Sequence, residues 1–311
     1  MHYSPAPLHI PDGFLSLVVS LICWAITAVT LAMAVSRTNK SLGEKQVPLM
    51  GIMAAFIFAA QMLNFPVAGG TSGHLLGGAL AAIVLGPWAG MLVMTAVIAV
   101  QALLFQDGGL LVMGANILNM GLVTAAIGYG LYRGVMNSSR GTKLAVAGVA
   151  AWLSVMAGAL LTSLQLWVSG TSQLQVVIPA MLGVHALIGI GEALITVGAL
   201  TFIFQTRPDL LDEKSASAQG GRGWVLPGVV LALAVVLLSP LASAFPDGLE
   251  RVAEDTGFLE LAQSSPYEII PDYTVPFLGE TALSTIVAGI VGALVVLGLS
   301  ILVGRSLQKK A

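Results

Sequence analysis

Two of the four histidines in this chain, His9 and His74, stand where a polar loop meets a long apolar run. The first lies in the sequence LHIPDGF and the second in GGTSGHLLGG. Imidazole nitrogens are ligands for nickel, cobalt, copper and zinc. If the fold brings these two rings to one face of the protein, the sequence predicts a transition-metal site there.

A histidine at the second position of a chain can chelate a metal ion with the α-amine of the first residue, its own backbone nitrogen and Nδ1 of its ring. A second imidazole completes four nitrogens, a planar set that suits Ni(II) and Cu(II) and also accommodates Co(II). Met1 and His2 have this arrangement as the chain is written. The other hypothesis is that translation starts at a leucine codon for Leu8, so that the amine of residue 8 and His9 form the chelate with His74. Both alternatives stay open at this stage.

Other polar residues near these histidines are predicted to support the site. Asn64, Thr71 and Ser72 precede the second histidine and are expected to hydrogen-bond a ligating imidazole. His185 and Glu192 fall within one apolar run, where a carboxylate marks a functional position by default. We expect both to have packing or coupling roles rather than to bind the metal directly.

The composition is that of an integral membrane protein. Hydrophobic residues make up 57% of the 311 residues and charged residues only 9%, whereas a soluble domain carries roughly 25% charged residues. The net charge of −2 gives no reason to expect nucleic acid as a partner. The single cysteine, Cys23, lies within the first apolar run and is predicted to be structural.

Eight apolar runs approach the ~20 residues that a spanning helix needs. A ninth run, residues 74–86, is shorter and ends at Gly86-Pro87, which predicts a short helix or a re-entrant segment packed inside the protein. Counting it as a crossing, we expect an all-α polytopic protein with a seven-crossing bundle at residues 1–204 (the front domain), a polar cytoplasmic linker at 205–223 and a two-crossing hairpin at 224–311 (the rear domain). A long outer loop, residues 245–280, joins the two helices of the hairpin. The eight longer spans are predicted at residues 14–35, 47–63, 88–106, 113–132, 143–168, 179–204, 224–244 and 281–303.

The basic residues test this topology. With the N-terminus outside and the C-terminus in the cytoplasm, only Arg251 among the 13 Lys and Arg residues lies on the outer side. If residues 74–86 did not cross, the later basic loops would change sides and this asymmetry would collapse. All four histidines then fall in the outer half of a bacterial or archaeal cell membrane.

Four segments resemble the cobalt/nickel substrate-capture component of energy-coupling-factor ABC importers, the CbiM/NikM type. They are HIPDGFL at residues 9–15, GTSGHLLG at 70–77, GANILNMG at 114–121 and HALIG at 185–189. The family usually begins Met-His, and Leu8-His9 occupies that place here. The resemblance implies that Ni(II) or Co(II) is bound by the amine and backbone of residues 8–9 and by the rings of His9 and His74, as cargo rather than as a permanent cofactor.

The rear domain resembles the PDGLE-type accessory component (CbiN/NikN-like), through FPDGLE at residues 245–250 and PDY at 271–273. This resemblance implies that it helps load or activate the capture domain. The chain contains no Walker A pattern, so it is not expected to hydrolyse ATP. The resemblance implies a transmembrane coupling subunit and two ABC ATPases as partners.

Two other functions remain as alternatives. An intramembrane serine protease of the rhomboid type would use Ser72 as nucleophile and His185 as base. An ATP-independent metal channel or exporter would need polar groups along its whole path, and the inner half of this chain lacks a matching set. The sequence does not distinguish nickel from cobalt.

Overall fold

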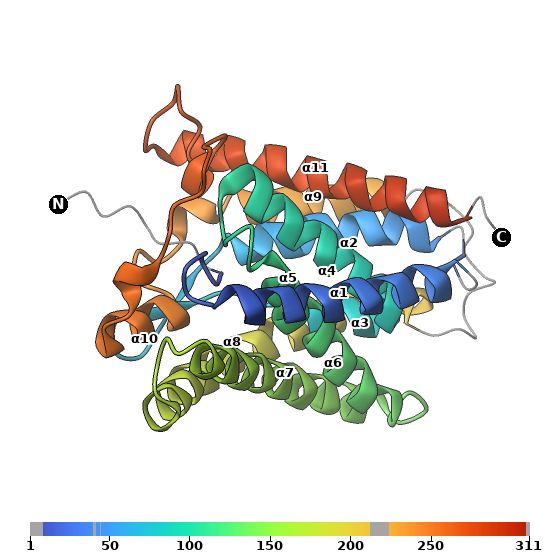
Figure 1. The fold of residues 1–311 in the computed structure, drawn as a ribbon. Coiled ribbons are helices and arrows are strands. Elements are labelled where there is room, and N and C mark those ends of the chain that lie inside the picture. The colour runs from blue at the N-terminus through green and yellow to red at the C-terminus, as the bar shows by residue number, and fades with distance from the viewer. Residues whose placement is uncertain (1–8, 40–41, 44, 212–223, 309–311) are drawn as a thin grey trace.

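The computed structural model describes residues 9–39, 42–43, 45–211 and 224–308, which form a bundle of helices (Figure 1). The predicted alternatives for the N-terminal chelate involve Met1, His2 and Leu8, which lie outside the described residues. Most of the predicted linker, from residue 212 onward, lies outside them as well.

The helices follow the predicted apolar runs closely. The front domain contains α1 (Leu17–Thr38), α2 (Gln46–Gln61), α3 (Gly78–Leu85), α4 (Pro87–Val100), α5 (Met113–Asn116), α6 (Thr124–Arg133), α7 (Arg140–Val168) and α8 (Leu174–Thr206). The rear domain contains α9 (Val225–Val236), α10 (Gly248–Thr256) and α11 (Ala282–Gln308). Two π-helical segments, Gln101–Phe105 and Ile117–Val123, continue α4 and join α5 to α6. Short 3₁₀ turns lie at Pro208–Leu210, Ser239–Leu241, Leu259–Leu261 and Pro271–Tyr273.

Five of the described helical segments are long and apolar enough to cross a membrane: Leu17–Thr38, Pro87–Phe105, Arg140–Val168, Leu174–Thr206 and Ala282–Gln308. Helix α2 and the segment that begins with α9 are apolar but shorter. The prediction of an all-α, multi-pass membrane protein is therefore confirmed. The number of crossings, seven plus two, stays a prediction.

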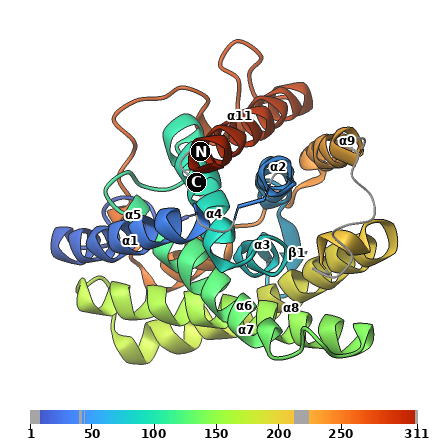
Figure 2. The same ribbon diagram turned by 90° about the vertical axis from the view of Figure 1, so that its right-hand side faces the viewer.

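Helix α3 is the short element expected within residues 74–86. All of its residues are buried, and it lies in the middle of the bundle among α2, α4, α6 and α8 (Figure 2). It ends at Gly86, whose φ of 83° lies in the left-handed region, and Pro87 opens α4 in the first helical turn, where proline is favoured. Of the two predicted alternatives, a short helix or a re-entrant segment packed inside protein, the structure has the short helix.

The rear domain packs against the front domain along α2. Helices α9 and α11 both contact α2, one on each side of it (Figure 2). The segment between them, which includes α10, lies at the end of the bundle where α1 begins (Figure 1). The outer loop of the rear domain is therefore placed against the start of the chain.

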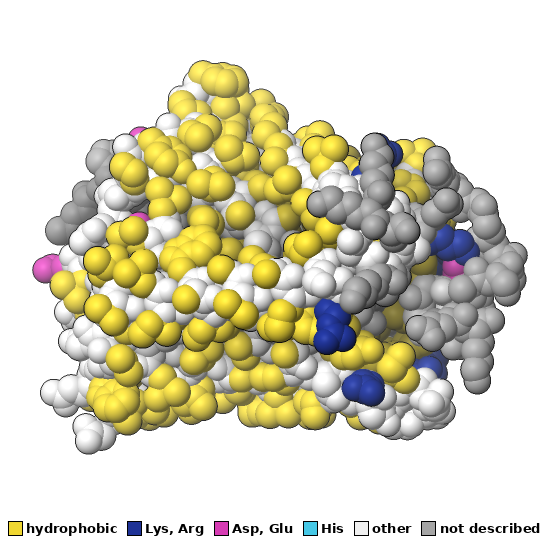
Figure 3. All heavy atoms as spheres, turned by 45° about the vertical axis from the view of Figure 1, so that its right-hand side comes forward, with side chains coloured by type: hydrophobic (Ala, Val, Ile, Leu, Met, Phe, Trp, Pro, Cys, Tyr) yellow, Lys and Arg dark blue, Asp and Glu magenta, His cyan; other side chains and the backbone are white. Residues whose placement is uncertain are grey.

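The surface is divided into an apolar belt and two polar ends. On the face shown in Figure 3, hydrophobic side chains cover the middle, most acidic side chains lie toward one end and the basic ones toward the other. Such a belt is typical of a protein surrounded by lipid. Which end faces the cell exterior remains a prediction.

A small β-hairpin is the element that the all-α prediction missed. Strand β1 (Phe65–Val67) pairs antiparallel with β2 (Thr71–Gly73), with Phe65 opposite Gly73. Each strand has only three residues, too few to show a period of two in the sequence. The hairpin matters because it ends immediately before His74.

Candidate metal site

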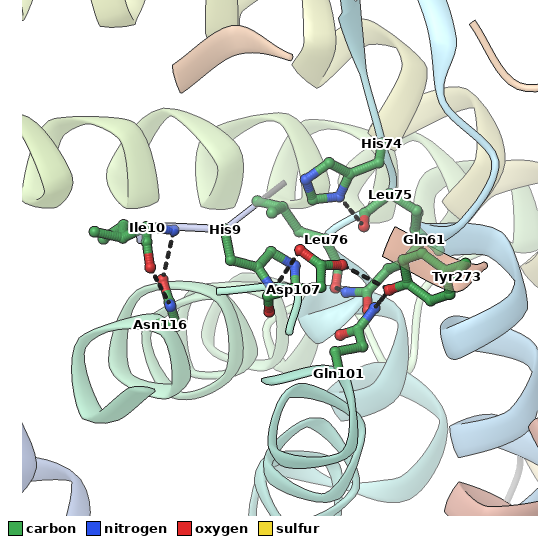
Figure 4. Close-up of polar contacts among 10 residues, drawn as sticks. All are labelled: His9, Ile10, Gln61, His74, Leu75, Leu76, Gln101, Asp107, Asn116 and Tyr273. Carbon is green, nitrogen blue, oxygen red and sulfur yellow. Dashed lines mark hydrogen bonds and ion pairs between the residues drawn. The ribbon is translucent and has the colours of Figure 1, made fainter. Parts of the chain in front are cut away.

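The structure brings the rings of His9 and His74 together, as the sequence analysis expected. Their centroids lie 5.6 Å apart with an interplanar angle of 65° (Figure 4). The exposed fractions are 2% for His9 and 7% for His74. Two residues that are 65 positions apart in the sequence are therefore buried side by side.

The segment that carries His9 is fixed by a side chain of α5 and by the backbone of the loop before α5. Asn116 donates to the carbonyl of Ile10 at 3.0 Å and accepts from its N–H at 3.1 Å (Figure 4). The carboxylate of Asp12 accepts from three successive backbone N–H groups, those of Leu110, Leu111 and Val112. These contacts hold an otherwise irregular stretch of backbone in one position.

Gly108 allows the segment that carries His9 to pack closely against the loop before α5. Its φ is +102°, and a Cβ there would lie 2.9 Å from Cβ of His9 and 3.0 Å from the Asn116 amide nitrogen. A side chain at this position would displace the histidine, so a glycine is required.

The loop that carries His74 is fixed by a buried carboxylate. Glu192 of α8 is fully buried and accepts from the N–H of Leu76 at 2.6 Å and of Gly77 at 2.9 Å. Gln61 at the end of α2 donates to the carbonyl of Leu76 at 2.9 Å (Figure 4). Glu192 thus has the packing role that we expected for it, and the group it positions is the backbone beside His74.

Both imidazoles are oriented through Nδ1. Nδ1 of His9 donates to the carbonyl of Asp107 at 3.1 Å, and Nδ1 of His74 donates to the carbonyl of Leu75 at 3.0 Å. Nε2 of His9 is buried without a hydrogen-bond partner in the described part of the chain. Chelation by Nδ1 of His9 would require this ring to leave the Asp107 carbonyl. Burial lowers the pKa of His9 below its ordinary value, with the nearby Asp107 opposing that shift, and so favours the neutral imidazole that binds metals.

The two rings border a cavity of about 70 Å³. Besides the rings, its lining includes Asn116, Asn119, His185, Asp247 and Gly248. Within the described residues, no group of three His, Cys, Asp or Glu side chains could hold a metal ion. A metal ion bound between the two rings therefore needs backbone nitrogen, an amine or water as its further ligands.

Of the three residues predicted to support His74, Ser72 has another side-chain partner. The hydroxyl of Ser72 donates to the carbonyl of Phe245 at 2.8 Å, and the carbonyl of Asn64 accepts from the N–H of Ser243. Thr71 is buried within β2. For Ser72 the prediction was wrong, because the hairpin turns its side chain toward the rear domain. For the side chains of Asn64 and Thr71 it stays a prediction.

The same contacts argue against a protease. A serine nucleophile needs its base within hydrogen-bond distance. Ser72 instead donates to the rear domain, and Nδ1 of His185 donates to the Met181 carbonyl one turn earlier in α8 at 2.8 Å. His185 is the hydrogen-bonded histidine that we expected, and it lines the cavity.

The rear domain covers the site, an arrangement that no local pattern in the sequence indicates. The backbone N–H of Ser72 donates to the carbonyl of Pro246 at 2.8 Å, and that of Gln263 donates to the carbonyl of Asp12, also at 2.8 Å. The rings of Phe14 and Phe258 meet edge to face with centroids 5.0 Å apart. The PDGLE segment itself contributes Asp247 and Gly248 to the cavity wall.

Comparison with known families accounts for this arrangement. Residues 9–210 match the model of the cobalt uptake substrate-specific transmembrane region, and residues 222–309 match the PDGLE domain. The chain belongs to the cobalt uptake (CbiM) family and carries a fused PDGLE domain. As a member of the CbiM family it is a metal transport protein rather than an enzyme, and the resemblance that the motifs indicated is confirmed.

Several relatives have the same fused organisation. A fused nickel transport protein, NikMN, from Rhodobacter capsulatus is 29% identical over 98% of this chain and 100% of its own length. A protein of Archaeoglobus fulgidus whose assigned name is also that of a fused NikMN is 38% identical over 96% of this chain and 98% of its own. The crystal structure of a transition metal transporter shares 34% identity and a TM-score of 0.59, and it covers 69% of this chain and 100% of its own.

Proposed function

We propose that this chain captures Ni(II) or Co(II) at the outer face of the cell membrane and delivers it for ATP-driven import. The observation that carries the proposal is the pair of buried imidazoles, His9 and His74, 5.6 Å apart beside a cavity of about 70 Å³. Nitrogen-rich sites suit both metals. The names of the relatives, which refer to nickel and cobalt transport, support the same class of cargo.

The proposed ligands are the two rings together with nitrogens from the start of the chain. If translation begins at residue 8, the amine of that residue and the backbone nitrogen of His9 complete four nitrogens. If it begins at Met1, the amine and ring of Met1-His2 are the alternative donors. The intact mass of the purified protein distinguishes these two hypotheses, because they differ by seven residues.

We further propose that a transmembrane coupling subunit and two ABC ATPases supply the energy, with the N-terminus outside and the C-terminus in the cytoplasm. The cavity lies at one polar end of the bundle and is small, which favours capture followed by a conformational step over free permeation through a channel. The proposed role of the rear domain, which covers the cavity, is to help load the metal ion into the front domain.

Metal retention tests the proposal. His9→Ala and His74→Ala should each abolish the retention of Ni(II) or Co(II) by the purified full chain, because either change leaves one imidazole. His185→Asn is the matched control: it alters the third histidine at the same cavity, keeps a donor for the Met181 carbonyl and should retain the metal. Retention of one metal ion per chain by the double variant His9→Ala/His74→Ala would refute the site.

A further inference from the structure

A continuous set of contacts connects the rear domain to the ring of His9. Tyr273 lies in the outer loop of the rear domain and donates its hydroxyl to Oδ2 of Asp107 at 2.6 Å (Figure 4). Asp107 lies next to His9: its carbonyl accepts from Nδ1 at 3.1 Å, and its Oδ1 lies 3.6 Å from the same nitrogen. All three side chains are buried.

Tyr273 is held firmly in this position. Its ring stacks on Phe105 with centroids 4.7 Å apart, and its hydroxyl accepts from Gln101 at 3.2 Å. Asp272 and Tyr273 have φ values of 48° and 56°, in the left-handed region that non-glycine residues seldom adopt. Such backbone persists only where the surrounding structure imposes it, and it concentrates at functional places.

The hydroxyl of Tyr273 is also fixed as a donor. Burial, together with the nearby Asp107 carboxylate, raises the pKa of Tyr273 well above its ordinary value, so the phenol keeps its proton. A protonated phenol between an amide donor and a carboxylate donates its hydrogen bond to the carboxylate. The rear domain thereby determines where the carboxylate of Asp107 lies.

Asp107 still has one acceptor to offer. Its Oδ1 is buried and has no hydrogen-bond partner among the described residues. An imidazole that binds a metal ion through one ring nitrogen carries a proton on the other. A hydrogen-bond acceptor for that N–H fixes the plane of the ring. Asp107 presents two acceptors to His9, its carbonyl and Oδ1, and both lie beside Nδ1. Asp107 can therefore fix the plane of the ring while Nε2, which has no partner among the described residues, binds the metal ion.

We propose that Asp107 is the positioning residue that orients the His9 ring for metal binding, and that Tyr273 of the rear domain holds Asp107 in place for this purpose. The inference rests on the proposed capture of metal by His9 and His74. If the inference is correct, the rear domain increases the metal affinity of the site, although the rear domain itself supplies no metal ligand.

Substitutions in the purified full chain, titrated with Ni(II) alone, test the proposal. Asp107→Ala should weaken Ni(II) binding about 10- to 100-fold, as the loss of such a supporting partner does at other metal sites. Asp107→Asn keeps an oxygen acceptor and should fall between native and Asp107→Ala. Tyr273→Phe keeps the ring that stacks on Phe105, loses only the hydroxyl and should weaken binding about tenfold.

Tyr267→Phe is the matched control. This tyrosine belongs to the same outer loop and donates to the front domain, but its acceptor is the carbonyl of Leu103 at 3.1 Å and not Asp107. It should bind Ni(II) as the native chain does. The second readout is the visible absorption of bound Ni(II) at saturation, which a merely structural loss would leave unchanged. It should shift in Asp107→Ala and Tyr273→Phe and stay unchanged in Tyr267→Phe.

The outcomes separate this inference from the proposed function. If His74→Ala abolishes binding while Tyr273→Phe and Asp107→Ala match the native affinity and absorption, the role of Asp107 and Tyr273 is refuted and the metal site stands. If His9→Ala and His74→Ala bind Ni(II) as the native chain does, the proposed function fails first. Equal weakening by Tyr273→Phe and Tyr267→Phe would also overturn the inference, because it would indicate loss of loop docking alone.

Discussion

Glu192 shows how a single buried side chain contributes to this site without facing the metal. A carboxylate buried among apolar helices is costly unless its oxygens are hydrogen-bonded. Here both oxygens accept backbone N–H groups, those of Leu76 and Gly77, which are 116 and 115 residues away in the sequence. The position of His74 relative to α8 follows from this satisfied carboxylate.

Asp247, the first acidic residue of the PDGLE segment, leads to a prediction on pH. Burial raises the pKa of Asp247 to about 7, while its hydrogen bond from the N–H of Glu250 at the start of α10 works in the opposite direction. The native state thus binds more protons than the unfolded state between about pH 4 and pH 7, so this residue makes the native state less stable as the pH rises through that range.

Asp247→Asn keeps an acceptor for the N–H of Glu250 but has no charge to bury. The free energy of unfolding of the variant, relative to the native chain, should therefore increase from pH 4 to pH 7 by up to about 4 kcal/mol, because the pKa of Asp247 is raised from 3.8 to about 7. Metal-free protein in detergent is the sample for this measurement. Asp255→Asn, which changes a largely exposed residue on the same helix, should keep the native pH profile. A constant difference between Asp247→Asn and the native chain across this range would contradict the prediction.

At the residue level, the sequence was sufficient for the two histidines and insufficient for their partners. His9 and His74 are identified by residue type and by their position between a loop and an apolar run. Asp107 and Tyr273 are 166 residues apart, and no local pattern indicates that their side chains meet. Asn64, Thr71 and Ser72 were assigned to His74 from proximity in the sequence alone, and the hairpin directs the Ser72 side chain to the rear domain instead.

Among the elements, the outer loop of the rear domain is the one that closes the site. Gly13 has a φ of +94°, and a Cβ there would lie 2.0 Å from the carbonyl oxygen of Leu261, so the two backbones touch. Phe258 then packs its ring against Phe14. The start of the chain is thus held between the front and rear domains.

Phe258→Ala should loosen this contact. Truncating a phenylalanine that is only 4% exposed costs about 3 kcal/mol of packing, which corresponds to about a hundredfold in an equilibrium constant. The backbone amides of residues 10–16 should therefore exchange with solvent deuterium about a hundredfold faster in the variant. Hydrogen exchange followed by mass spectrometry measures this directly.

Phe277→Ala provides the control, since this phenylalanine of the same outer loop is 85% exposed. It should leave the exchange of residues 10–16 unchanged. Equal exchange in Phe258→Ala and in the native chain would show that the outer loop does not hold the start of the chain.

The elements themselves were predictable to different degrees. Apolar runs fixed the helices to within a few residues, as the expected span 47–63 and the observed α2 (Gln46–Gln61) illustrate. The π-helical segments Gln101–Phe105 and Ile117–Val123 were not foreseen, because they have the same apolar composition as the α-helices around them. The docking of the outer loop was also missed, since its turns carry no periodic pattern.

On the scale of the whole molecule, the separation of charges predicts an orientation in the membrane. The outer loop is rich in Asp and Glu, while all basic residues but Arg251 flank the predicted inner loops. Figure 3 shows the corresponding separation on one face. The end that carries His9 and His74 should then face the cell exterior.

Cysteine labelling in intact cells tests this orientation. Cys23 is buried and can be replaced by alanine, which leaves a chain without cysteine. A membrane-impermeant maleimide should then label Ser264→Cys, in the exposed part of the outer loop, and should not label Ser138→Cys, exposed in the loop before α7, until the cells are opened. The reverse pattern would place the metal site on the cytoplasmic side.

X-ray absorption at the nickel edge of the Ni(II)-loaded full chain tests the central claim most directly. The two rings, together with nitrogens from the start of the chain, predict a first coordination shell made mainly of nitrogen, with the outer-shell scattering of two imidazoles. The imidazole scattering should be lost, along with the bound nickel, in His9→Ala/His74→Ala. A first shell of oxygen alone, or a spectrum that this double variant leaves unchanged, would contradict the account.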